Sequence, residues 1–103
     1  MLIHLSPDDA LSIAEMADNQ HPNQPTNLIT ERIEKLGDLG IAELHALILI
    51  GEGLFPVDAG IEENWLDAIA LTTDTLSQAD AAMLAASPRL AANIRSGLDL
   101  ISP

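Results

Sequence analysis

The chain has 103 residues, no cysteine, one tryptophan and one phenylalanine, and 16 acidic against four basic residues give a formal net charge of −12. The lack of cysteine excludes disulfides, thiolate metal sites and cysteine nucleophiles. A surface of this charge repels phosphate backbones and anionic lipid, so we expect no direct nucleic-acid binding and no membrane binding.

A chain of this length is expected to form one domain, residues 1–103. Its core must be aliphatic, and the many alanines favour closely packed helices. No stretch reaches the roughly 18 apolar residues of a membrane helix. The start lacks the basic region and the long apolar run of a secretory signal, so we expect a cytoplasmic protein.

The first predicted helix runs from Pro7 to about Asp18. Ser6 is a suitable N-cap, Pro7 suits the first helical position, and two aspartates follow at the positive end of the helix dipole. Residues 19–26 contain two prolines and several amides but no aliphatic side chain. We predict a flexible loop there, because such a segment cannot contribute to a core.

The second helix is predicted from about Thr26 or Asn27 to Leu36, with Gly37 as the left-handed residue that ends it. We expect this helix to bury four aliphatic side chains: Leu28, Ile29, Ile33 and Leu36. A short connection, residues 38–40, then leads into the next helix.

The stretch 43–53 holds the densest group of branched aliphatic residues in the chain. Its apolar side chains cover most of the helical circumference, which predicts a central buried helix at about residues 40–51. Glu43 is expected to assist the N-terminus of this helix. Gly51 and Gly53 are expected to end it.

Residues 54–60 are predicted to form a loop whose apolar side chains fold back on the core. The next helix is expected to begin near Gly60, with Trp65 as its largest anchor. One face of this helix carries Ile61, Trp65, Ala68, Ile69, Thr72 and Leu76.

A start resembling a capping box at 77–80 predicts a short helix that contains Met83 and Leu84 and ends at Ser87. Ser87 and Pro88 are then expected to begin the last helix directly. Gly97 on the edge of that helix predicts a close approach to another helix. The apolar stripe of the last helix is Leu90, Ile94, Leu98 and Ile101. The sequence therefore predicts an all-α fold, a compact orthogonal bundle of about five or six helices around the central helix.

Several features in this order resemble a small bacterial family, domain of unknown function 3775. They are the early Leu-Ser-Pro helix start, the turn at 49–53, Trp65 in the following helix, and the tail segments 83–90 and 94–98. Met83 stands where that family often has a tyrosine, and Ala86 or Ser87 replaces the glycine of its turn. The resemblance implies a helical fold and a bacterial cytoplasmic protein. It implies no catalytic residue, because the family has no assigned activity.

No catalytic or cofactor-binding residue and no cofactor is predicted from the sequence. Candidate metal ligands are His45 with Glu52, and Glu63 with Asp67, which lie four positions apart on one helical side. Each has an ordinary explanation as well, since a lone histidine is commonly a boundary residue and a run of acids a solvated face. The spacing of a calcium loop is absent.

Three functions remain open from the sequence. The first is a non-enzymatic interaction or regulatory module, acting as a homodimer or with a partner that has a basic surface. Its candidate contact residues are Leu54, Phe55 and Trp65. The second is a cation-binding protein or small metal-dependent enzyme that uses His45 and the acidic residues, which requires at least three ligands around one point. Mimicry of a nucleic acid by the acidic surface is a third possibility.

Overall fold

The computed structural model describes residues 2–19, 27–74 and 81–101. These residues form six α-helices, one 3₁₀ turn and no strand, which confirms the prediction of an all-α fold. The elements are α1 (Pro7–Asp18), α2 (Asn27–Glu34), α3 (Gly37–Gly51), η1 (Val57–Ala59), α4 (Ile61–Asp74), α5 (Ala81–Ala85) and α6 (Leu90–Ile101). Their Cα atoms have a radius of gyration of 12.7 Å.

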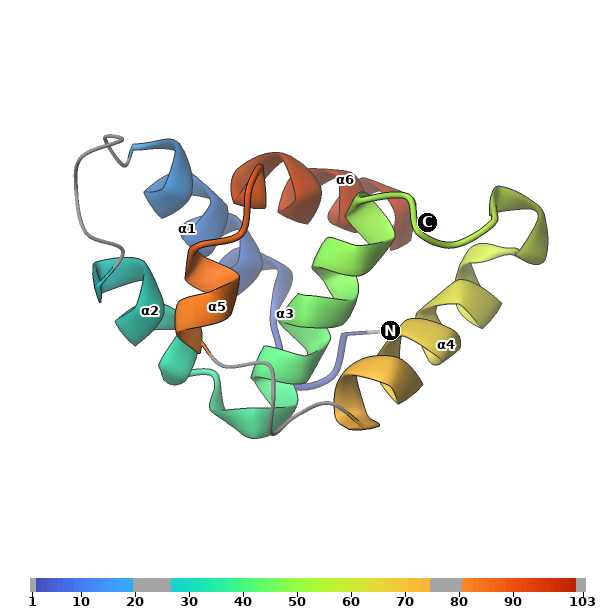
Figure 1. Ribbon diagram of the computed structural model, residues 1–103, viewed down its shortest axis with the longest axis horizontal. Coiled ribbons are helices and arrows are strands. Elements are labelled where there is room, and N and C mark those ends of the chain that lie inside the picture. The colour runs from blue at the N-terminus through green and yellow to red at the C-terminus, as the bar shows by residue number, and fades with distance from the viewer. Residues whose placement is uncertain (1, 20–26, 75–80, 102–103) are drawn as a thin grey trace.

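Helix α3 lies in the middle of the molecule (Figure 1). It packs against α6 and, on another side, against α4. Helix α1 packs on α6, and α2 packs on α5 as well as on α1 and α3. None of the described helices has both the length and the apolar character that a membrane span needs.

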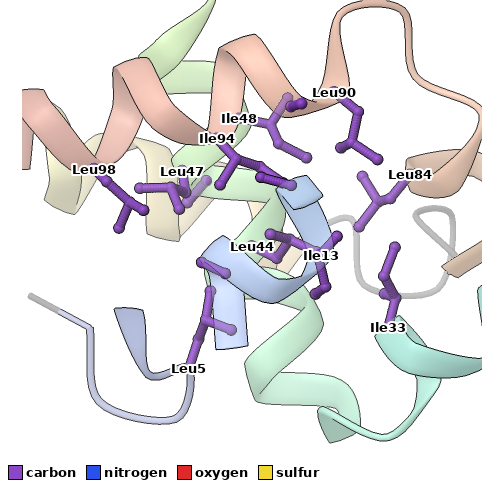
Figure 2. Packing of buried hydrophobic residues seen from close by; sticks show 14 of the residues in the cluster. Leu5, Ile13, Ile33, Leu44, Leu47, Ile48, Leu84, Leu90, Ile94 and Leu98 are labelled. Atoms are coloured by element: carbon purple, nitrogen blue, oxygen red, sulfur yellow. The ribbon is translucent and has the colours of Figure 1, made fainter. Parts of the chain in front are cut away.

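The core is built on α3, as the aliphatic density of its sequence predicts. Leu44, Leu47 and Ile48 of this helix are almost fully buried. Figure 2 shows them beside apolar side chains from the other elements, namely Leu5, Ile13, Ile33, Leu84, Leu90, Ile94 and Leu98. The side chains of this cluster are apolar, so what they contribute to stability comes from hydrophobic packing.

Helix α1 begins as its capping residues predict. The Ser6 hydroxyl accepts a hydrogen bond from the backbone N–H of Asp9 at 3.1 Å, and Pro7 is the first helical residue. Two ion pairs join this helix to its neighbours, Asp9 to Arg32 of α2 at 2.6 Å and Asp18 to Arg95 of α6 at 2.5 Å. The hydrogen bond from Arg32 lowers the pKa of Asp9.

Glycines allow α3 and α6 to approach each other closely. A Cβ atom on Gly97 would overlap the carbonyl oxygen of Leu47, and a Cβ atom on Gly51 would overlap the backbone of Asn93. The predicted close approach at Gly97 is therefore confirmed. Backbone contact of this kind leaves no room for a side chain at either position.

Two expectations about α2 and α3 are wrong. Leu28 is exposed, because the buried side of α2 is the one that carries Ile29 and Ile33. Residues 38–40 are not a connection, since α3 already begins at Gly37. Gly37 does have the predicted left-handed conformation, with φ of 77°, so the chain turns there and enters the next helix at once.

The expected start of the last helix is also wrong. Helix α6 begins at Leu90 rather than at Ser87 and Pro88. The Ser87 hydroxyl donates to the carbonyl oxygen of Met83, so it belongs to the end of α5 and does not cap α6. Arg89, with φ of 56°, makes the turn between the two helices. Residues 20–26 of the loop predicted at 19–26, Leu76 and the helix start predicted at 77–80 lie outside the described residues.

Candidate functional site

The carboxylate of Glu43 holds the segment before α1 against α3. This side chain is 4% exposed, and its oxygens accept hydrogen bonds from three backbone N–H groups. The donors are Ile3 at 2.8 Å, His4 at 2.8 Å and Leu5 at 3.3 Å. Charge-assisted bonds of this kind offset the loss of hydration that a buried carboxylate suffers.

The expected role of Glu43 is therefore wrong. It does not assist the N-terminus of the central helix, because α3 begins six residues earlier, at Gly37, and the side chain points to a different segment. A signal for this role exists in the sequence: Glu43 is a carboxylate in the most aliphatic helix of the chain, with no basic residue near it. A buried carboxylate without a basic partner needs backbone donors.

An apolar cavity of about 260 Å³ lies beside this clamp, between residues 3–4, α3 and α4. Trp65 and Ile69 of α4 and Ala42 of α3 are among the residues that line it. Three large side chains at the same cavity are exposed, Ile3 by 83%, Leu39 by 50% and Leu66 by 68%. We call the cavity together with Ile3, Leu39 and Leu66 the open face.

The surroundings of the open face are acidic. Glu62 and Glu63 lie one turn before Leu66 on α4, and Asp67 follows it directly; all three are exposed. The residues that line the cavity include no lysine or arginine. Arg32 and Arg95 are both bonded to aspartates of α1. The open face therefore has an apolar centre and acidic residues near it in the sequence.

No family model, curated protein or solved structure matches the chain. The resemblance to domain of unknown function 3775 accordingly stays a prediction, and the case for a function rests on the geometry of this chain.

The structure divides the predicted contact residues between two places. Trp65 lines the cavity of the open face but is itself 6% exposed, so it forms the floor and not the rim. Phe55 is partly buried and lines a second cavity of about 200 Å³ near the end of α3, together with Asn64 and Leu100. Leu54 is exposed in the same segment of the chain. The expectation that residues 54–60 fold back on the core therefore holds for Phe55 and fails for Leu54.

Sequence reasoning missed Ile3, Leu39 and Leu66. Leu39 falls in the stretch that the sequence predicts as a connection, and Leu66 follows Trp65, which the sequence favours as the anchor of its helix. The only available signal is that Leu66 falls off the apolar stripe of its helix, between exposed acids, where a large aliphatic side chain has no core to join.

The candidate metal ligands do not converge. Glu63 and Asp67 are exposed on α4, and Glu52 is exposed and accepts from Asn93 Nδ2 at 3.5 Å. Among the described residues, no group of three or more His, Cys, Asp or Glu side chains is placed to hold a metal ion.

His45 has an unusual environment for a different reason. It is half-buried on α3, and its Nδ1 atom is buried with no hydrogen-bond partner. Burial lowers the pKa of this imidazole, and the negative charge of Glu52 opposes that shift in part. The lowered pKa favours the neutral form of this imidazole.

Proposed function

We propose that the protein is a non-enzymatic interaction module that binds a protein partner through the open face. The observation that carries the proposal is the gathering of Ile3, Leu39 and Leu66 around one apolar cavity. These residues come from three different parts of the chain, so their meeting is a property of the fold. Singly exposed leucines are ordinary on protein surfaces, whereas a group of them around a cavity is typical of a binding site.

Burial of the open face against a partner would lower the free energy relative to its exposure to water. Each Å² of apolar surface that a partner removes from water contributes about 25 cal/mol. The floor of the cavity is already fixed by Trp65, and one wall is fixed by the Glu43 clamp. A surface that is ordered before binding loses less conformational entropy when the partner arrives.

Cation binding is the alternative function. It would use His45 with Glu52, or Glu63 with Asp67, but no observation within the described ranges favours it over contact. The proposal also places the protein in the cytoplasm of a bacterium, as the resemblance of its sequence implies.

Site-specific photo-crosslinking tests the contact function. A photoreactive amino acid replaces Leu66 in the full chain, and Leu39 in a second variant, and the protein is irradiated in cells of the organism that encodes it. The matched control carries the same amino acid at Leu71, which is exposed on the same helix but does not line the cavity. Mass spectrometry identifies the crosslinked peptide.

We expect positions 39 and 66 to give an adduct with the same protein, either another copy of the chain or a different partner, and position 71 to give none. The absence of any adduct from positions 39 and 66 would contradict the proposal. The same adducts from all three positions would contradict it as well, because they would report collision and not docking.

A further inference from the structure

The open face offers a partner one apolar hollow, which we call the seat. Its cavity lies where α3 and α4 meet, with Leu39 contributed by one helix, Leu66 by the other, and Ile3 by the segment that Glu43 holds in place. Apolar side chains spaced three and four residues apart on a helix fit into a groove of this kind, as amphipathic helices do in many protein complexes.

The acidic residues near the seat favour a partner with basic side chains. Asp38 directly precedes Leu39 on α3. On α4, Glu62 and Glu63 lie four and three positions before Leu66, and Asp67 follows it; all four acidic residues are exposed. From residue 36 to residue 88 the sequence contains no lysine or arginine to balance them. A complementary partner therefore carries basic side chains beside its apolar stripe.

A second copy of the chain fits this charge poorly. Two copies meeting through the same surface would bring the acidic residues of one against those of the other, and each copy carries a net charge of −12. Like charges placed opposite each other at an interface oppose association.

We infer that the open face binds a basic amphipathic helix of another protein. The apolar stripe of that helix enters the cavity between Ile3, Leu39 and Leu66, and its lysines or arginines reach the acidic residues on either side. This inference rests on the proposed function and adds to it the chemical class of the partner.

The single tryptophan of the chain makes the test direct. Trp65 lines the cavity, so its fluorescence reports occupation of the seat. The full chain is titrated with a tryptophan-free helical peptide of leucine and lysine in an amphipathic pattern. Two control peptides are a scrambled sequence of the same composition and a peptide with the same leucine pattern in which glutamate replaces lysine.

We expect a saturable change in fluorescence with the amphipathic leucine–lysine peptide alone. Its Kd should rise as salt increases from about 50 to about 300 mM, because screening weakens the contact between the charges. Leu66→Ser should raise Kd by about tenfold or more, since this exposed leucine stands at the margin of the cavity, where it would contact the apolar stripe of the peptide. The double variant Glu62→Gln/Glu63→Gln should raise Kd less and reduce its dependence on salt.

Matched substitutions away from the seat serve as controls. Leu71→Ser on the same helix and Glu34→Gln at the end of α2 should leave Kd unchanged. No saturable change, equal binding of the scrambled peptide, or unchanged Kd in Leu66→Ser would overturn the inference.

The two proposals fail in different ways. If positions 39 and 66 crosslink to another copy of the chain, the inference is wrong and the contact function stands. The same conclusion follows if they crosslink to a different protein but the leucine–lysine peptide does not bind. If those positions give no adduct, the contact function itself is wrong.

Discussion

Helix α3 meets α6 and α4 in opposite ways. Toward α6 the packing is closed, because Gly51 and Gly97 bring the two backbones into direct contact. Toward α4 a cavity of about 260 Å³ remains, and large apolar side chains at its margin are exposed to water. On the closed side the two helices complete the core between them, and on the open side large apolar side chains stay in contact with water.

The close packing of the closed side is due to small residues. The wall of the open side is held in place by the hydrogen bonds of Glu43. Glycine permits a short distance between helices and leaves no volume to fill. On the open side, Glu43 uses its carboxylate to hold the wall that Ile3 and His4 provide. Substitutions on the two sides should therefore differ in both size and kind.

The largest effect is expected from Glu43→Ala. This change leaves three backbone N–H groups without their acceptor and releases the segment that contains buried Leu5. We expect the free energy of unfolding to fall by about 3 kcal/mol in chemical denaturation. Glu43→Gln, which keeps one acceptor oxygen without the charge, should lose less.

Glu34→Gln, at an exposed position, is the control for the loss of a carboxylate. If Glu43→Ala were no more harmful than this control, the clamp would not hold the open side together.

Gly97→Ala tests the closed side. Alanine in the middle of a helix normally stabilises it relative to glycine, but here the new Cβ atom would overlap the backbone and side chain of Leu47. We expect a loss of about 2 kcal/mol in the free energy of unfolding, measured by circular dichroism with denaturant.

Ser96→Ala is the neighbouring control, because Ser96 is exposed on the same helix. It should change the free energy of unfolding by less than about 0.5 kcal/mol. A gain in stability in Gly97→Ala would show that the two helices are not in contact there.

A smaller effect on stability is expected when His45 titrates. The pH dependence of stability reports how far the imidazole on α3 is shielded from water. Burial lowers its pKa below the ordinary value of 6.5, so the unfolded chain binds a proton more readily than the folded one. The stability due to the neutral imidazole is complete above pH 6.5 and is lost as pH falls from there through the lower folded pKa.

His45→Gln cannot titrate and serves as the reference. We expect the Tm of the native chain to fall relative to that of the variant as pH falls from about 7.5 to about 5. A constant difference across that range would mean that the imidazole is hydrated in the folded state.

Local chemistry explains what the sequence could predict. The start of α1 follows from Ser6 and Pro7, the burial of α3 from its aliphatic density, and the close approach of α6 from Gly97. Each of these signals lies within a few residues of the structure that it specifies.

The candidate site depends on contacts between distant parts of the chain. Glu43 binds N–H groups that lie 38 to 40 residues before it. The open face joins Ile3, from the segment before α1, with Leu39 of α3 and Leu66 of α4. No periodicity in the sequence marks such a meeting. The sequence predicts Trp65 as a contact residue, but this side chain is 6% exposed and forms the floor of the cavity.

If the open face exists as described, its exposed leucines contribute little to the stability of the fold. The double variant Leu39→Ser/Leu66→Ser tests this most directly. The measurement is its free energy of unfolding by chemical denaturation beside that of the parent chain. We predict a difference of less than about 0.5 kcal/mol per site, as for other exposed positions. A loss of about 2 to 5 kcal/mol per site, the range of a buried leucine, would place both side chains in the core and contradict the existence of an open face.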